Sequence, residues 1–341
     1  MNSGNEKQKV KIATLGSHSA LQILKGAKDE GFETIVMAAG KQAKLYRRFP
    51  LADEIIELGH YSEFPALDEK LVKENAMLIP HGSIVSYTSL EKLNEMKCNY
   101  YGNKKVLEWE SDRSKQRQWM ESAGLKVPRQ FKNPSDIDVH TIVKYYGARG
   151  GKGYFVVNNE SEYEAGLDKF GRHPATMQEY IIGVPFYIHY FQSALTGELE
   201  VMSMDRRYET NVDSLGRMPL KSQQGMVIDP SFVVVGNAPL VLRESMLETA
   251  FEMGENLVEA SKKFAGPRGL FGPFCIETII TPEQEFFVME VSARIVAGTN
   301  LFVEGSPYTA LKYDKPVSTG RRIAMEVKQA QKEERLADII G

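Results

Sequence analysis

Two glutamates stand out because each interrupts an apolar segment that has the composition of a β-strand. Glu277 lies in FGPFCIETII and Glu290 lies in EFFVMEVSARI, with the turn-like residues TPEQE between them. A symmetric, even-length hairpin loop centred between Glu283 and Gln284 would place Glu277 opposite Glu290. Opposed like charges destabilise a pair of strands unless something between them offsets the repulsion. Mg²⁺ would do so, because it typically takes one or two carboxylates and completes its shell with waters and phosphates.

Two other interpretations of these glutamates stay open from the residues alone. A register shifted by one residue would place them on opposite faces of the sheet. An ion pair with an arginine such as Arg294 would give one of them a structural role instead.

A lysine and a run of glycines could hold phosphate. Lys144 lies in the apolar segment IVKYY, and residues 147–153 (GARGGKG) follow it. Glycines let backbone N–H groups approach phosphate oxygens, and lysine supplies a compact positive charge. The segment is not a P-loop, because no Ser or Thr follows Lys152, and Val156 breaks a GxGxxG pattern. A simple turn between strands is the alternative, but phosphate, a divalent metal and two acids together would suit phosphoryl transfer.

The elements that would position these groups fall into two parts. Apolar runs at 10–15, 34–37, 55–58 and 76–79 alternate with helical segments up to about residue 110, which predicts a parallel sheet with covering helices. His18 and Ser19 follow the first run, and Ser83 follows the fourth in the sequence HGS. These loops would meet at one edge of the sheet, where open α/β sheets bind ligands and helix N-termini favour anions. We therefore expect a phosphorylated small molecule there; helix capping by the serines is the alternative.

The second part is mainly antiparallel. A helix is predicted over 112–123, with Asp112 as its N-cap and Gly124 after its end. Strands follow from His140 onward, interrupted by one long helix whose apolar stripe runs from Leu242 to Phe264, and a charged helix near 321–335 closes the chain. We expect an α/β domain over 1–111 and an α+β domain over 112–341, divided into a smaller lid-like part (112–182) and a larger part (183–341). The arginine doublets at 47–48 and 206–207 are interpreted as solvated, and no role is assigned to His60, His140, His173 or His189.

Composition excludes several classes of function. The 341 residues carry 42 Lys and Arg against 45 Asp and Glu, a net charge of −3, so no global positive field is present to hold nucleic acid or an anionic membrane. Two cysteines are too few for a disulfide framework and fit a reducing cytoplasm. No apolar run approaches the roughly 18 residues of a membrane span, and the mean hydropathy is −0.33. The first βα turn lacks the glycine pattern of a dehydrogenase.

The order of these features resembles the ATP-grasp superfamily. More narrowly, the segments GSHSALQILKGAKDEGF, PHGS, YYGNKKVLEWESDR, RRYETNVD, VLRESML and MEVSARIVAGTN resemble the archaeal-type formate-dependent AICAR formyl ligases, the FAICAR synthetases of purine biosynthesis. Here AICAR is 5-aminoimidazole-4-carboxamide ribonucleotide and FAICAR is its formylated product. The resemblance implies an N-terminal parallel-sheet domain before an ATP-grasp domain with antiparallel sheets. It also implies conversion of AICAR, formate and ATP to FAICAR, ADP and phosphate through formyl phosphate, with Mg²⁺ or Mn²⁺, in a cytoplasmic homo-oligomer.

The resemblance also implies roles for individual residues. The groups expected to hold ATP are Arg113, Lys144, Gly150, Gly151, Gly153, Glu179, Tyr180, Ile181 and Glu209. Those expected to bind AICAR are His18, Ser19, Ser83 and Asn237, and the metal would lie on Glu277 and Glu290. We further expect Arg294 to bind the substrate or the transferring phosphate and to act with Lys144 in catalysis. Residues 147–153 are expected to close over the site.

Two features depart from the ATP-grasp pattern, and two rival functions stay open. Ser292 stands where many members have a metal-binding Asn, and Val184-Pro185 follow the hinge glycine where a ribose-binding Glu is frequent. The rivals are an ATP-grasp ligase for another carboxylate and amine, and a sensor that binds a nucleotide without turnover.

Overall fold

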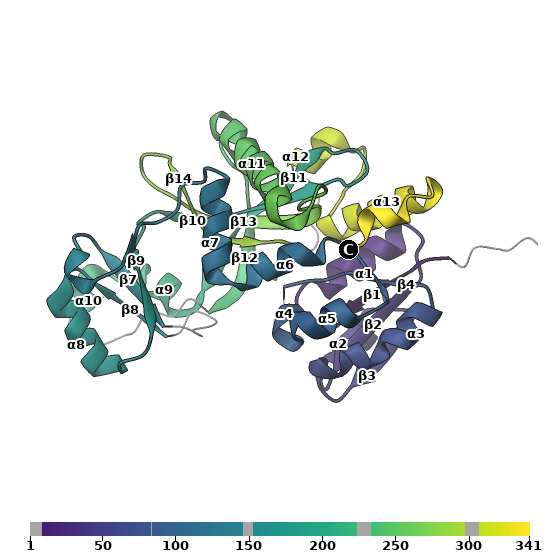
Figure 1. Cartoon of the computed structure of the whole chain (residues 1–341), viewed down its shortest axis with the longest axis horizontal. Helices are drawn as coiled ribbons and strands as arrows, with labels where there is room; N and C mark the ends of the chain where they lie inside the picture. Colours follow the sequence, from purple (N-terminus) through teal and green to yellow (C-terminus); the bar gives the residue numbers. More distant parts are fainter. Residues whose placement is uncertain (1–8, 83, 146–152, 224–232, 297–306) are drawn as a thin grey trace, which may run out of the picture.

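The computed structural model describes residues 9–82, 84–145, 153–223, 233–296 and 307–341. The described chain forms three sheets, one in the N-terminal part and two in the part that follows (Figure 1). Among the described residues, no helix combines the length and the apolar character that a bilayer crossing needs.

The N-terminal sheet is parallel throughout and has the strand order β3-β2-β1-β4-β5. Its strands are β1 (Lys11–Leu15), β2 (Thr34–Ala39), β3 (Glu54–Leu58), β4 (Ala76–Leu78) and β5 (Asn99–Tyr100). The helices between them are α1 (Ala20–Asp29), α2 (Gln42–Arg48), α3 (Asp68–Lys73), α4 (Ile84–Tyr87) and α5 (Leu90–Glu95), with a 3₁₀ turn at Tyr61–Leu67. Along β2, Ile35 and Met37 enter one apolar cluster while Val36 and Ala38 enter another. Burial on both faces explains why these strands are continuous apolar runs.

Two helices lead from this sheet into the rest of the chain, α6 (Lys104–Ser111) and α7 (Arg113–Ser122). Asp112 caps α7 by accepting hydrogen bonds from the backbone N–H groups of Ser114 and Lys115, and Gly124 follows with φ +69°. The predicted N-cap and the predicted end of this helix are both confirmed.

The second sheet is small and antiparallel, with the order β6-β9-β7-β8. Its strands are β6 (Gln130–Phe131), β7 (Thr141–Tyr145), β8 (Tyr154–Val157) and β9 (Ala175–Glu179), and helix α8 (Glu160–Phe170) covers one face. Val143 packs toward α8, so the alternation of the strand turns Ile142 and Lys144 to the other face. Helix α8 was not predicted; only Leu167 of its residues is buried, which leaves little apolar periodicity in the sequence.

The third sheet is larger and antiparallel, with the order β12-β11-β10-β13-β14. Its strands are β10 (Val184–Gln192), β11 (Leu199–Glu209), β12 (Val234–Leu240), β13 (Gly272–Ile280) and β14 (Phe286–Ser292). One face is apolar: Ile188, Tyr190 and Ile276 pack in one core with residues of α7 and of α11 (Leu247–Ala265). Their sequence neighbours therefore point to the opposite face, which carries the polar groups described below. Three short helices complete this part of the chain: α9 (Thr210–Leu215), α10 (Leu220–Gln223) and α12 (Pro307–Lys312). Of these, α9 and α12 contact β11.

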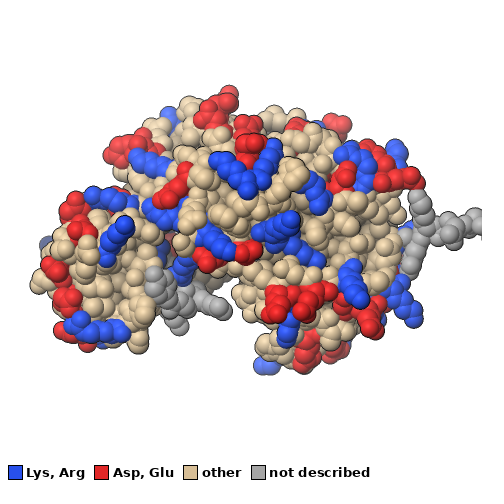
Figure 2. Space-filling view, viewed as in Figure 1, with Lys and Arg blue, Asp and Glu red and all other residues tan. Residues whose placement is uncertain are grey.

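The end of the chain returns to its beginning, since α13 (Thr319–Lys332) packs against α1. A Cβ atom at Gly320 would lie 2.3 Å from the Gln22 carbonyl oxygen, so only glycine permits this approach. The domain boundaries given above stay predictions. Acidic and basic side chains are interspersed over the face shown in Figure 2, in keeping with the small net charge.

Candidate active site

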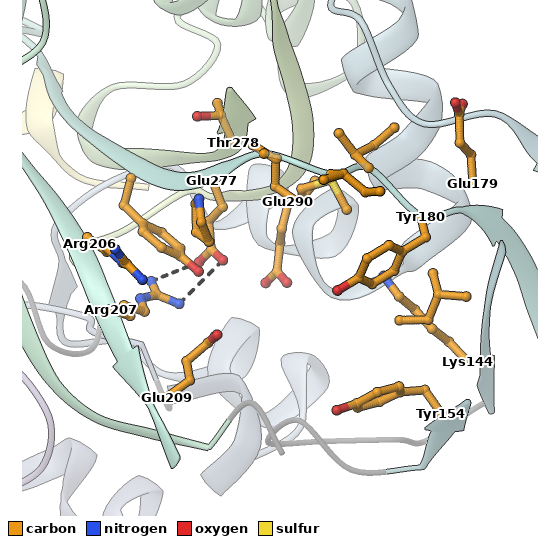
Figure 3. A pocket seen from close by; sticks show the side chains of 18 of the residues that line it. Lys144, Tyr154, Glu179, Tyr180, Arg206, Arg207, Glu209, Glu277, Thr278 and Glu290 are labelled. Atoms are coloured by element: carbon orange, nitrogen blue, oxygen red, sulfur yellow. Dashed lines mark hydrogen bonds and ion pairs between the residues drawn. The ribbon is translucent and has the colours of Figure 1, made fainter. Parts of the chain in front are cut away.

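A cleft of about 560 Å³ opens between the small sheet and the polar face of the large sheet (Figure 3). The small sheet contributes Ile142, Lys144 and Tyr154 to its lining. The other lining residues come from the start of α7, the connection between β9 and β10, and the large sheet; they include Arg113, Tyr180, Ile181, Gly183, Tyr187, Arg207, Glu209, Glu277, Met289 and Glu290. The cleft thus gathers residues from segments that lie far apart in the sequence.

The two glutamates do lie opposite each other, as predicted, but a β-bulge is needed to bring them together. The loop at 281–285 has five residues, and the register next to it pairs Thr278 with Val288. Continued regularly, that register would place Met289 opposite Glu277 and turn Glu290 to the other face. The register instead shifts by one residue after Thr278, so Glu277 pairs with Glu290 and Met289 is the extra residue. Bulges re-aim side chains next to active sites in this way.

Arg207 is the cation beside the acidic pair. Its guanidinium lies over the Tyr187 ring, 3.8 Å from the centroid, and donates to both carboxylate oxygens of Glu277, at 3.0 and 3.3 Å. The Arg207 side chain is only 15% exposed, so the expectation of a solvated doublet is wrong for this residue. Arg206 is 44% exposed and pairs with Asp213. Successive residues of a strand point to opposite faces, which was the available signal for an inward Arg207, although Arg206 also contributes to the lining of the cleft.

Electrostatics in this part of the cleft disfavour two negative charges. Burial raises the pKa of Glu277 and the neighbouring Glu290 raises it further, while Arg207 opposes both effects. The pKa of Glu277 nevertheless stays raised, so the repulsion is only partly offset. Among the described residues, no group of three or more His, Cys, Asp and Glu side chains could hold a metal ion. The opposed pair offers two carboxylates to a cation.

Two cations also line the cleft. Lys144 projects from β7 on the small sheet, and Arg113 begins α7. Burial lowers the pKa of Lys144, and the like charge of Arg113 lowers it further, whereas Glu290 acts in the opposite direction. The cleft therefore carries two neighbouring cations and two neighbouring acids.

The connection between β9 and β10 forms one end of the cleft. Tyr180 and Ile181 line it, and the backbone N–H of Tyr180 donates to the His140 carbonyl oxygen at 2.7 Å. The carboxylate of Glu179 points away from the centre and accepts from the Arg129 backbone N–H at 3.2 Å. A Cβ atom at Gly183 would lie 2.3 Å from the Ile280 carbonyl oxygen, so glycine permits the close contact with β13.

Glu209 ends β11 and faces the cleft. Burial raises its pKa to about 7, with a further contribution from Asp213 and opposition from Arg207 and Arg206. Glu209 also raises the pKa of Tyr180 beyond the effect of burial, which reflects the proximity of the two residues across the cleft.

A second group of polar residues lies at the edge of the N-terminal sheet. His18 has φ +44° and contacts His81, with ring centroids 5.7 Å apart; burial and then Arg294 lower its pKa. Ser19 is buried, and its hydroxyl donates to the Val296 carbonyl oxygen. Arg294 is 9% exposed and pairs with Glu110 at 2.6 Å, so it does not line the cleft.

Some of the predicted site residues lie outside the described part of the chain: Ser83, Gly150, Gly151 and the rest of segment 147–153 except Gly153. Gly153 has φ +81°. Ser292 is buried on β14 opposite Cys275. Asn237 lies on β12 opposite Arg207 and is therefore on the polar face of the large sheet.

Comparison with known proteins identifies the family. A model described as "Protein of unknown function (DUF1246)" matches residues 12–131, and one described as "Domain of unknown function (DUF1297)" matches residues 159–341. The 5-formaminoimidazole-4-carboxamide-1-(beta)-D-ribofuranosyl 5'-monophosphate synthetase of Thermococcus kodakarensis is 51% identical over 338 residues, covering 97% of this chain and 100% of that protein. The chain belongs to the FAICAR synthetase family. The synthetase of Pyrococcus horikoshii is likewise 51% identical, with 97% of this chain and 99% of that protein covered.

Solved structures agree with membership of the FAICAR synthetase family. The IMP biosynthesis protein PurP from Thermococcus kodakaraensis matches with a TM-score of 0.78 and 26% identity, over 97% of this chain and 100% of that chain. An N5-carboxyaminoimidazole synthetase from Staphylococcus aureus complexed with ADP matches with a TM-score of 0.61 and 17% identity, over 86% and 73%. The latter is a likeness of fold alone. The predicted arrangement, a parallel-sheet unit before an ATP-grasp unit with antiparallel sheets, is confirmed.

Proposed function

We propose that the chain is a ligase that formylates AICAR with formate and ATP, giving FAICAR, ADP and phosphate. The observation that carries the proposal is the arrangement of charge in the cleft. Lys144 approaches from the small sheet, Glu277 and Glu290 lie on the large sheet, and Arg113 lines the cleft close enough to influence Lys144. Each pair repels itself, and a triphosphate with a divalent cation supplies the opposite charge to both pairs at once.

The nucleotide would lie along the cleft with its base at the hinge. Tyr180 and Ile181 offer apolar surface there, and Glu209 lies within reach as an acceptor for a hydroxyl or amino group. Lys144 and Arg113 would hold the phosphates, because both bring positive charge into a partly dry cavity where it acts strongly on anions.

The donor set fits Mg²⁺ or Mn²⁺. Two opposed carboxylates, of which Glu277 is paired with Arg207, match the one or two protein carboxylates that Mg²⁺ uses beside substrate phosphates. Bound on Glu277 and Glu290, the ion would neutralise charge on the phosphate oxygens.

AICAR would bind between the N-terminal loops and the large sheet. Burial lowers the pKa of His81 to about 3, so the ring stays neutral. The Nε2–H of His81 donates to the Leu15 carbonyl oxygen at 2.9 Å, which leaves the Nδ1 atom of His81 as an acceptor. Within the described part of the chain, His81 Nδ1 and Arg294 Nε are buried without hydrogen-bond partners. Buried polar atoms normally have partners, so these two favour a bound polar ligand beside His18.

The chemistry divides into two steps. Formate is an unactivated carboxylate, and the AICAR amine is a weak nucleophile because the carboxamide-bearing ring withdraws its lone pair. A formate oxygen would attack the γ-phosphorus, and the bond from that phosphorus to the bridging oxygen would break, giving ADP and formyl phosphate. The amine nitrogen would then attack the formyl carbon, phosphate would leave, and the amine would lose a proton. Lys144 would act by positioning and by neutralising charge on the oxygens that become more negative. Arg294 pairs with Glu110 outside the cleft and influences His18, so it is better placed to bind AICAR than to act with Lys144.

The test is to mix the protein with MgATP, formate and AICAR, and to measure ADP and formylated ribonucleotide together. We expect ADP release that requires formate and matches FAICAR one to one. ATP turnover that is unchanged by AICAR would refute the substrate assignment, and nucleotide binding without turnover would point to a sensor. The family resemblance also supports a homo-oligomer in the cytoplasm. Measurement of the particle size in solution tests the oligomer, and cell fractionation tests the location.

A further inference from the structure

A buried histidine and aspartate on the polar face of the large sheet take no part in the mechanism above. His189 on β10 and Asp205 on β11 are 3% and 1% exposed, with His189 Nε2 lying 2.6 Å from Asp205 Oδ2. The other oxygen, Asp205 Oδ1, accepts a hydrogen bond from Asn237 Nδ2 at 3.1 Å. The three side chains thus form a chain from the centre of the sheet to β12.

The chemistry of Asp205 fixes the direction of each hydrogen bond. An ionised carboxylate only accepts, so the amide group of Asn237 must turn its nitrogen toward Asp205. The amide oxygen of Asn237 then points away from Asp205 as an acceptor. His189 holds the second carboxylate oxygen and prevents Asp205 from turning away from Asn237.

The location connects this chain of hydrogen bonds to the substrate side of the site. Asn237 lies opposite Arg207, which contacts Glu277, and His189 lies opposite Cys275. Cys275 packs with Tyr187 and Val296, and the Val296 carbonyl oxygen accepts from Ser19 in the first βα loop. The network therefore lies between the proposed metal ligands and the loop that carries His18.

We propose that Asp205 and His189 are positioning residues, which hold the Asn237 amide so that its oxygen accepts a hydrogen bond from an N–H or O–H donor of the ribonucleotide substrate. This inference rests on the proposed function. It makes position 237 selective for a donor on the substrate, since the Asn237 nitrogen is already engaged.

The test exchanges the two polar groups. Asp205→Asn removes the fixed acceptor, so the Asn237 amide can turn over; we expect the KM for AICAR to rise about tenfold, with the KM for ATP unchanged. Asn237→Asp alone places a second carboxylate against Asp205 and should weaken AICAR binding as well. In the double variant, the new amide at 205 donates to the new carboxylate at 237, whose other oxygen again faces the substrate. We expect the double variant to recover most of the AICAR affinity.

Two controls keep the outcomes distinct. Asp53→Asn changes a carboxylate that accepts from Thr34 in the N-terminal sheet, far from the network, and should leave the KM for AICAR unchanged. Asn237→Leu removes the acceptor and the donor to Asp205 Oδ1 but keeps the pair of Asp205 with His189, and should raise the KM for AICAR even where Asp205→Asn does not fold. An unchanged KM in Asn237→Leu, or a double variant no better than either single variant, would overturn the inference. Failure of the wild-type protein to formylate AICAR would instead refute the proposed function.

Discussion

Replacing Glu290 with glutamine should make the metal-free protein more stable and the enzyme inactive. Glu290→Gln keeps the size of the side chain and removes its charge. In the folded protein this charge lies opposite Glu277, whose side chain is 16% exposed, and Arg207 offsets only part of the repulsion. Like charges directly opposite across a strand pair cost about 0.2–1 kcal/mol. Because Glu290 is exposed to solvent and also attracts Lys144, the free energy of unfolding should rise by less than about 1 kcal/mol.

The same substitution should abolish phosphoryl transfer. It removes one of two proposed protein ligands of the metal, and we expect kcat for ADP release to fall at least about 100-fold. AICAR binding should stay near the wild-type value, because Glu290 is proposed to hold the metal beside ATP and not to contact AICAR. A gain in stability with a loss of activity is the signature of a group retained for function.

Three measurements and one control test this reasoning. Chemical unfolding in EDTA gives the stability of the metal-free protein, coupled ADP release gives kcat, and equilibrium binding gives the affinity for AICAR. Glu283→Gln, an exposed residue in the turn of the same hairpin, is the matched control and should change none of them. If Glu290→Gln lowers the stability by more than about 1 kcal/mol, or retains near wild-type kcat, the glutamate is structural and the proposed metal site is wrong.

Three further outcomes follow from the cleft. Arg207→Met should raise the pKa of Glu277 further and lower the free energy of unfolding by about 2–3 kcal/mol at pH 8. Measured by urea unfolding, this loss should be smaller at pH 5, where Glu277 takes up a proton. An equal loss at both pH values would contradict the prediction. Because the pKa of Glu209 is about 7 in the folded protein and near 4.5 when unfolded, the folded state binds more protons between these values; stability should therefore fall as pH rises through that window, and Glu209→Gln should flatten the slope. Gly183→Ala should cost about 1–3 kcal/mol, because its Cβ would lie 2.3 Å from the Ile280 carbonyl oxygen, and should raise the KM for ATP; an unchanged thermal midpoint would count against the contact.

The elements that could be predicted are those whose burial leaves a regular pattern. The parallel strands are buried on both faces and appear as continuous apolar runs, and α11 shows its stripe because it packs on the large sheet along its length. Helix α8 buries little besides Leu167, and β12 is an edge strand with mostly half-exposed residues. Neither element therefore has a regular pattern of apolar residues, and neither was predicted.

In the candidate site, too, some features could be predicted from the sequence and others could not. The pairing of Glu277 with Glu290 was predicted from a symmetric loop, yet the actual loop is odd in length and the bulge at Met289 restores the pair. The role of Arg207 depends on which face each member of a doublet takes, and that of His189 depends on the register between β10 and β11. Such tertiary relationships leave no periodic trace in one sequence.

The charges in the cleft connect the two antiparallel sheets energetically. Burial lowers the pKa of Lys144, and Glu290 opposes this shift, so the acid on the large sheet favours the charged form of the lysine on the small sheet. A metal-bound triphosphate would take over this role, because it presents negative oxygens to Lys144 and a cation to Glu290. Binding should therefore stabilise the approach of the two sheets by more than either contact alone would suggest. In a double-mutant cycle, Lys144→Met and Glu290→Gln should then lower ATP affinity less together than the sum of their separate effects, whereas strict additivity would mean that the sheets bind the nucleotide independently.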